Sequence, residues 1–282
     1  MSEYAIEIKN LEKSFKQFNL GPINLAIPKG SIVGYIGQNG AGKSTTIKLL
    51  LGLLKPDQGI IKLLGEENIN NTEIRNKLGI VFDDLFLPEE LTTKAVAWFC
   101  SQVYSQWDKK KFKQLQVKFQ LPENQIIRHY SRGMKMKLSL AIAFSHQAEL
   151  LILDEATSGL DPIVREEILD MLLEFMQSED HTVLVSSHIL SDLEKIADYI
   201  AFIDNGQLLF MEEKDELKEN YGICAVSAEQ FLELDKSAIV GVRSHAFGKE
   251  ILVKRSLIPL GIKIEKPSIE DIMIYLVKGE KQ

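Results

Sequence analysis

The stretch Gly37–Thr45 reads GQNGAGKST and is the most informative part of the chain. It matches G-x-x-x-x-G-K-[ST], and it follows the apolar run SIVGYIG at 31–37. After it, apolar residues recur at i, i+3, i+4 and i+7 from Ile47, which predicts one face of a helix. Glycines let a backbone wrap a phosphate, and the amides at a helix N-terminus attract its charge. The sequence therefore predicts a strand, a phosphate-binding loop and a helix.

Two side chains of this loop have individual roles in the prediction. We expect Lys43 to bridge the β- and γ-phosphates of a nucleotide and the hydroxyl of Ser44 to ligate Mg²⁺. The residues that we expect to bind the nucleotide here are Gly37, Asn39, Gly40, Ala41, Gly42, Lys43, Ser44 and Thr45.

A second stretch, LLILDEATSGLDP at 150–162, supplies acidic groups. Four apolar residues place Asp154 at the end of a buried strand, where ligands bind in open α/β sheets. Asp154 can hold Mg²⁺ through water, since this ion keeps several of its own waters. Glu155 follows directly and can orient a water that attacks the γ-phosphate. The pair predicts a metal carboxylate beside a general base.

Composition excludes several classes of protein. The 282 residues carry 33 basic and 40 acidic side chains, a net charge of −7, so no nucleic-acid partner is expected. The apolar runs are much shorter than the roughly 20 residues that a membrane-spanning helix needs. The N-terminus shows no apolar signal core, which predicts that the chain is not exported. Cys100 and Cys224 are too few for a disulfide framework.

The order of elements predicts an α/β fold. Apolar, β-branched runs alternate with helical patterns, which indicates a mostly parallel sheet covered by helices. From Leu87 to about Phe119 the pattern turns helical. After about Tyr221 the alternation of strand and helix patterns ends. There HAFG (245–248) predicts a hairpin, and Ser268 with Asp271 predicts a capping box that starts a last helix.

These motifs, taken in order, resemble the ATP-binding subunits of ABC transporters from about Ile6 to Phe210. Gly37–Thr45 is similar to the Walker A loop, LLILDE to Walker B, SGLDP (158–162) to the D-loop and YSRGMKMKLSLAIA (130–143) to the signature motif. The resemblance implies a P-loop NTPase core at 1–221 with an inserted helical subdomain at about 84–148. Residues 222–282 would then form a small C-terminal α+β appendage.

The resemblance also implies roles for single residues. Glu155, His188 and Lys43 take the catalytic positions; Ser44, Asp154 and Asp83 take the metal positions. Phe15 lies where the family stacks an aromatic ring on adenine, and the remaining expected nucleotide contacts are Ser131, Gly133 and Asp161. Three residues depart from the family pattern: Arg132 replaces a glycine and Met134 a glutamine in the signature, and Asp83 replaces the Q-loop glutamine.

By the same resemblance, two such subunits pair head to tail around ATP and Mg²⁺, as a homodimer or a heterodimer. A separate membrane permease is expected to contact about 84–128, which places the chain at the cytoplasmic face of the cell membrane. The resemblance is strongest to bacterial exporters of drugs, antimicrobial peptides or other amphipathic molecules. The alternative is a soluble ABC-type ATPase that transports nothing. A GTPase is disfavoured, because NKLG at 76–79 lacks the aspartate of a guanine-reading motif.

Overall fold

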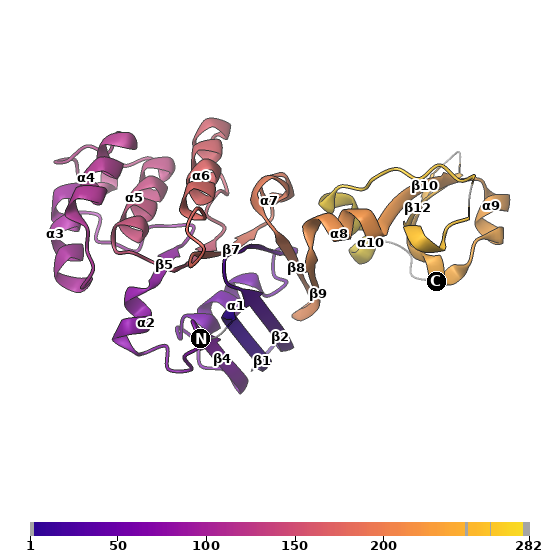
Figure 1. The fold of residues 1–282 in the computed structure, drawn as a ribbon, viewed down its shortest axis with the longest axis horizontal. Coiled ribbons are helices and arrows are strands. Elements are labelled where there is room, and N and C mark those ends of the chain that lie inside the picture. The colour runs from indigo at the N-terminus through magenta and orange to yellow at the C-terminus, as the bar shows by residue number, and fades with distance from the viewer. Residues whose placement is uncertain (1–2, 246–247, 260, 279–282) are drawn as a thin grey trace.

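A computed structural model describes residues 3–245, 248–259 and 261–278 of the chain. In Figure 1 a large α/β body carries, at one side, a smaller unit built from the C-terminal residues. Within the described residues, no helix has both the length and the apolar composition to cross a membrane.

A six-stranded sheet forms the centre of the large body, and every strand pairing in it is parallel except the last. In sheet order the strands are β5 (Leu78–Val81), β6 (Leu150–Asp154), β7 (Thr182–Ser187), β3 (Ile32–Ile36), β8 (Tyr199–Asp204) and β9 (Gln207–Glu213). All residues of β3, β6 and β7 are buried, because helices or a second sheet cover both faces. The predicted α/β fold with a mostly parallel sheet is confirmed.

A second, antiparallel sheet covers one side of the phosphate-loop helix. It is composed of β2 (Asn19–Pro28), β1 (Tyr4–Ser14) and β4 (Gln58–Leu63) in that order. Helix α1 (Lys43–Leu50) buries Ile47 and Leu50 in the hydrophobic core that this sheet shares with Val33 and Ile152 of the central sheet. This packing holds α1 in place after the loop 37–42 that follows β3.

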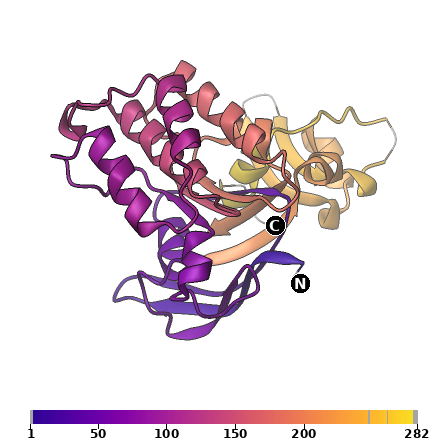
Figure 2. The ribbon, with the colours of Figure 1, turned by 60° about the vertical axis from the view of Figure 1, so that its left-hand side comes forward.

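The inserted helices lie on the opposite side (Figure 2). They are α3 (Thr93–Val103), α4 (Lys109–Lys118), a 3-10 turn at Ile127–His129 and α5 (Arg132–Ser145), whereas the short α2 (Thr72–Asn76) packs Ile74 into the core of the antiparallel sheet. The stretch from Leu87 to about Phe119, whose pattern is helical, forms helix at Thr93–Val103 and Lys109–Lys118. It contains two helices, because the side chains of Thr92 and Asp108 each cap a new N-terminus.

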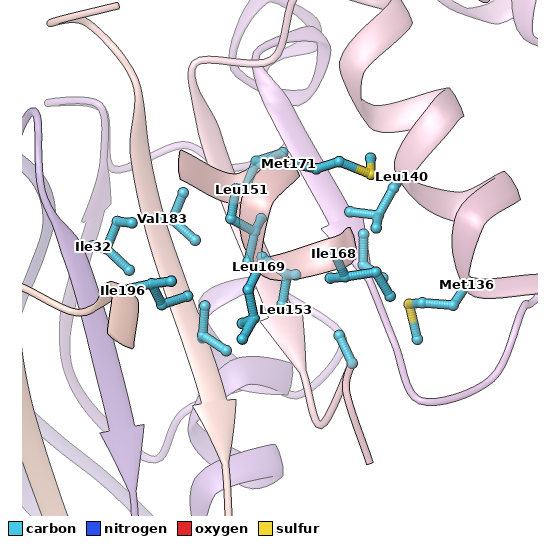
Figure 3. Packing of buried hydrophobic residues seen from close by; sticks show 14 of the residues in the cluster. Ile32, Met136, Leu140, Leu151, Leu153, Ile168, Leu169, Met171, Val183 and Ile196 are labelled. Atoms are coloured by element: carbon cyan, nitrogen blue, oxygen red, sulfur yellow. The ribbon is translucent and has the colours of Figure 1, made fainter. Parts of the chain in front are cut away.

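Helix α5 packs against α6 (Pro162–Phe175) and the strands beneath. Figure 3 shows Met136 and Leu140 of α5 facing Ile168 of α6, with Leu151 of β6 beside them. The helix α7 (Leu190–Ile196) follows β7 and belongs to the same core.

The C-terminal unit has its own three-stranded antiparallel sheet. It comprises α8 (Lys214–Asn220), β10 (Tyr221–Val226), α9 (Ala228–Glu233), β11 (Ile239–His245), β12 (Gly248–Lys254) and α10 (Ile269–Lys278), with 3-10 turns at Lys236–Ala238 and Arg255–Leu257. Strands β11 and β12 pair as the expected hairpin, although 246–247 of HAFG lie outside the described residues. The capping box is confirmed: Asp271 donates its amide hydrogen to Ser268 Oγ at 3.0 Å, and Ser268 donates its own to Asp271 Oδ2 at 2.9 Å.

Candidate active site

The glycine loop leads from the carboxyl end of β3 into α1. Gly42 occupies the N-cap position with φ +116°, a conformation that residues with a side chain rarely adopt. Thr46 then donates its amide hydrogen to the Gly42 carbonyl oxygen at 2.9 Å, the first bond of the helix. The loop therefore presents its backbone around the helix N-terminus, as phosphate binding requires.

Lys43 is buried at the base of this loop, with only 5% of its surface exposed. Its ammonium group donates to the carbonyl oxygens of Gly37 at 2.8 Å and Gln38 at 3.3 Å, and it lies 3.3 Å from Glu155 Oε1. These contacts hold the cation at a fixed point between the loop and the end of β6.

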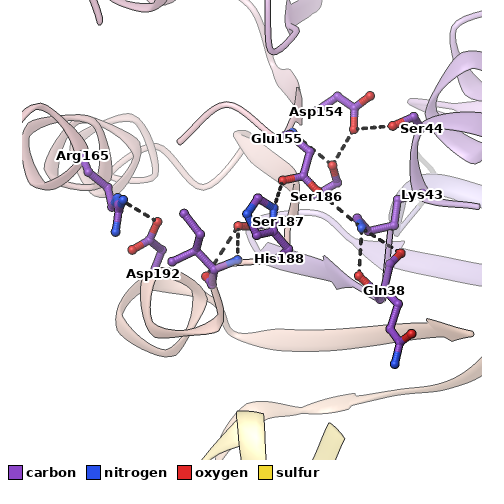
Figure 4. A network of polar contacts seen from close by, with 12 residues as sticks. Gln38, Lys43, Ser44, Asp154, Glu155, Arg165, Ser186, Ser187, His188 and Asp192 are labelled. Atoms are coloured by element: carbon purple, nitrogen blue, oxygen red, sulfur yellow. Dashed lines mark hydrogen bonds and ion pairs between the residues drawn. The ribbon is translucent and has the colours of Figure 1, made fainter. Parts of the chain in front are cut away.

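Three oxygen-bearing side chains meet where β6 and β7 end (Figure 4). Asp154 Oδ1 accepts from Ser44 Oγ at 3.2 Å and from Ser186 Oγ at 2.6 Å. Asp154 and Ser186 are register partners of adjacent parallel strands, which explains why their side chains meet. Carboxylate and hydroxyl oxygens are the ligands that Mg²⁺ prefers, so this group fits the predicted metal position.

Glu155 has an unusual backbone. Its φ of +53° is left-handed, and its amide donates to the Ser186 carbonyl oxygen at 3.1 Å. Conformations of this kind persist where surrounding structure over-determines them, often at functional sites. The carboxylate Oε2 lies 2.5 Å from Nδ1 of His188, which follows β7. Lys43, Glu155 and His188 thus form one continuous polar chain (Figure 4).

A cavity of about 370 Å³ collects these groups. Among the predicted residues its wall contains Asn39, Gly40, Gly42, Lys43, Ser44, Thr45, Asp83, Glu155 and His188. Three further wall residues were not predicted to line it: Phe18, Arg132 and Ser158. The structure therefore brings the glycine loop, Glu155, His188 and Asp83 to one place.

Other predicted nucleotide contacts lie outside the wall of this cavity. Phe15 is 43% exposed, and its ring lies 6.3 Å from that of Phe18, which does line the cavity. Ser131 Oγ accepts from the Met134 amide at 3.2 Å and caps α5; Asp161 caps α6 in the same way. Gly133 lies in the first turn of α5. Their roles toward a nucleotide stay predictions.

Comparison with known proteins agrees with this geometry. The ABC transporter family matches residues 20–158. The bacitracin transport ATP-binding protein BcrA of Bacillus licheniformis is 31% identical, over 97% of both proteins. The chain belongs to the ABC transporter family. The lantibiotic transport ATP-binding protein SrtF of Streptococcus pyogenes is 35% identical over 74% of this chain and 91% of its own length.

A solved ATP-binding subunit of an ABC transporter has the same fold, with a TM-score of 0.69 and 28% identity over 76% of this chain and 92% of that one. The chain is thus an ABC-type ATPase, the ATP-binding subunit of a transporter. Sequence reasoning missed Ser186, which bonds Asp154, and Phe18. Ser186 could have been found, since it lies in the last two residues of the buried strand β7, two positions before His188, while Asp154 ends β6. Phe18 has no comparable signal.

Proposed function

We propose that this ABC ATPase drives the export of an antimicrobial peptide through a separate permease in the cell membrane, from its cytoplasmic face. The observation that carries this proposal is the gathering of phosphate loop, base and switch histidine in one cavity. The similarity to ATP-binding proteins named for bacitracin and lantibiotic transport supports the class of cargo.

In the proposed reaction each residue has a defined task. Lys43 binds the β- and γ-phosphates, while Ser44 and Asp154 hold Mg²⁺, Asp154 through water; Asp83 faces the same cavity. Bound Mg²⁺ neutralises charge that develops between the β- and γ-phosphates. Glu155 orients the attacking water and accepts its proton. His188 contacts the γ-phosphate, and its hydrogen bond positions the Glu155 carboxylate.

A second ABC ATPase subunit, identical or related, completes the proposed site. The α5 N-terminus carries Ser131 and Gly133, and the α6 N-terminus carries Asp161. Such termini attract anions, and neither of these residues in α5 lines the cavity of its own chain. This supports a head-to-tail dimer in which they bind the nucleotide of the partner.

The permease is proposed to dock beside the inserted helices. A groove of about 580 Å³ between the core and these helices is lined mainly by apolar side chains, with Val103 and Tyr104 from the expected segment 84–128. Leu53, Ile80 and Val103 in this groove are 61%, 38% and 54% exposed. Exposed apolar side chains gathered in a groove are the kind of surface that an interaction site uses. Leu53 and Ile80 extend the proposed contact beyond 84–128.

The test is a resistance assay in the cell that encodes the chain. Deleting its gene is expected to lower the concentration of bacitracin or of a lantibiotic that inhibits growth. Wild-type chain restores that concentration, and Glu155→Gln does not, because the variant binds ATP without turnover. Co-purification of a polytopic membrane protein with the chain from detergent tests the permease. Unchanged susceptibility to both peptide classes would contradict the proposed cargo.

A further inference from the structure

A buried carboxylate behind the cavity connects the two segments of chain that carry Glu155 and His188. Asp192 belongs to α7, four positions after His188, and only 4% of its surface is exposed. Its Oδ2 atom lies 3.8 Å from Nε of Arg165, which belongs to α6 (Figure 4). Arg165 in turn donates from Nη2 to the carbonyl oxygen of Leu160 at 3.2 Å. Asp192 thus reaches the loop between β6 and α6 through a guanidinium.

The same carboxylate also meets the start of this loop, which spans residues 155–161. Thr157 is 2% exposed and follows Glu155 by two positions. Burial raises the pKa of Asp192, and a hydrogen bond from the Thr157 hydroxyl opposes that shift, because the bond stabilises the charged carboxylate. The loop 155–161 is therefore bound to Asp192 near both of its ends.

The contact between Glu155 and His188 depends on this support because it is itself partly open to solvent. The side chain of His188 is 46% exposed, and that of Glu155 is 19% exposed. Ion pairs at the surface hold their side chains weakly, since water competes for both groups. The contacts of Asp192 join the same two segments of chain in a buried place, where hydrogen bonds and charge attraction are stronger. The buried contacts therefore set the distance at which the more exposed contact forms.

The pair of Arg165 and Asp192 attracts through charge without forming a hydrogen bond. Arg165 Nε and Asp192 Oδ2 are both buried, and neither atom has a hydrogen-bond partner in the part of the chain that the structure describes. Such atoms are rare in native folds, because each has given up its bonds to water without replacement. A glutamate at 192, longer by one methylene group, would reach Nε and complete the bond.

We propose that Asp192 is a positioning residue for ATP hydrolysis, which holds the loop 155–161 against α7 and so keeps Glu155 within reach of His188. This inference rests on the proposed roles of these two residues toward the attacking water and the γ-phosphate. Asp192 does not line the nucleotide cavity and acts only through the side chains that contact it. A small displacement of a base from its water lowers the rate of reaction steeply, whereas the glycine loop still binds the phosphates.

The test separates turnover from binding in the full-length chain. Steady-state ATPase assays give kcat, and isothermal titration calorimetry with Mg²⁺ and AMP-PNP, a hydrolysis-resistant ATP analogue, gives the dissociation constant. Asp192→Asn keeps the shape of the side chain and removes its charge. We expect this variant to lower kcat by about tenfold and to leave the dissociation constant within about twofold. Arg165→Gln, at a less buried position, is expected to do the same, and it decides the test if Asp192→Asn does not fold.

Three further variants show whether the effect belongs to this contact. Asp192→Glu keeps the charge and reaches Arg165 Nε, so its kcat is expected to stay within about twofold of wild type. Glu166→Gln is the matched control, because Glu166 and Lys195 form another ion pair between α6 and α7, 2.5 Å apart and exposed at the surface. Its kcat and dissociation constant are expected to match wild type. The double variant of Asp192→Asn and Arg165→Gln is expected to be no slower than the slower single variant, since both changes remove one contact.

The inference is overturned if Asp192→Asn and Arg165→Gln turn over ATP at the wild-type rate. It is also overturned if Glu166→Gln is equally slow, because any link between α6 and α7 would then suffice. A loss of AMP-PNP affinity that matches the loss of kcat would assign Asp192 to the stability of the fold. Wild-type turnover by Glu155→Gln would instead contradict the proposed base, which is a failure of the proposed site and not of this contact.

Discussion

Glu155 links the two halves of the active site. Its left-handed backbone turns the chain sharply after β6, so its carboxylate faces both Lys43 and His188. The amide of the same residue is held by Ser186, on the neighbouring strand. The position of the base therefore depends on β7 as much as on β6.

Ser186→Ala tests this dependence. The hydroxyl is fully buried and donates to Asp154 Oδ1 at 2.6 Å, so its removal deprives the carboxylate that we propose binds Mg²⁺ of a donor. We expect the steady-state ATPase rate to fall by about tenfold, in line with the loss of one hydrogen bond to a charged group. Ser139→Ala removes a similar hydroxyl bonded within α5 and is the control. Equal steady-state ATPase rates of Ser186→Ala and wild type would contradict the proposal that the Ser186 hydroxyl supports the Asp154 carboxylate.

Lys43→Ala removes the buried cation of the loop. We expect its affinity for ATP to fall by at least about tenfold, because the phosphates lose a charged hydrogen-bond donor. Titration with a fluorescent ATP analogue measures the change. An unaltered dissociation constant would disprove the role given to this ammonium group.

Residues that belong to a local sequence motif could be predicted, and residues that reach the cavity through tertiary packing could not. Lys43, Ser44 and Glu155 could be predicted because each lies in a short local motif that can be recognised without knowledge of its distant neighbours in space. Phe18 and Arg132 reach the cavity from segments far from the loop, so their placement depends on tertiary packing. Phe15 and Phe18 lie three positions apart, and the sequence contains no signal that favours Phe18 as the residue at the cavity.

At the scale of elements, the buried imidazole of His146 connects the C-terminus of α5 to the ends of α2 and α3. His146 stacks on Tyr104 with ring centroids 4.1 Å apart, and its Nδ1 lies 3.0 Å from the Asn76 carbonyl oxygen. Burial lowers the pKa of His146 from its ordinary value of 6.5, because the charged form loses solvation. This contact lies in the wall of the groove proposed for the permease.

The lowered pKa has a consequence for stability. His146 is neutral in the fold and gains a proton more readily when unfolded. Its contribution to the free energy of unfolding is therefore fully present above about pH 6.5. This contribution is lost as the pH falls through the pKa of His146 in the folded chain. We expect His146→Phe, which keeps an aromatic ring, to reduce the loss of unfolding free energy between about pH 6.5 and pH 5. Urea denaturation measures the free energy of unfolding of the variant and of wild type at each pH. Parallel pH curves for variant and wild type would contradict the expectation.

Elements were predicted well where their pattern was regular. The all-buried strands β3, β6 and β7 read as continuous apolar runs, and α6 showed a clear helical period. The break between α3 and α4 was missed because apolar residues continue through it, and only Asp108, as an N-cap, marks the new start. The antiparallel sheet β2-β1-β4 depends on long-range pairing between β1 and β4 that no local pattern encodes.

At the scale of the whole molecule, the C-terminal unit is anchored to the helix that follows the switch histidine. Glu194 of α7 accepts from the Ile269 amide at 2.6 Å and lies 3.4 Å from Lys218. The unit thus contacts the catalytic body through α7, two residues beyond His188 in the chain. The change in pattern after about Tyr221 predicted a C-terminal unit, but its contact with α7 was not predicted.

The head-to-tail dimer is tested most directly by analytical ultracentrifugation of Glu155→Gln with Mg-ATP. The variant is predicted to sediment as a dimer with ATP and as a monomer with ADP, because ATP binds both partners and is not hydrolysed. Adding Gly133→Asp should return it to monomer. A Cβ at 133 meets Val164 only at 3.4 Å, an ordinary contact, so the change disturbs the partner site and spares its own fold. A Glu155→Gln chain that stays monomeric with ATP bound would contradict the proposed dimer.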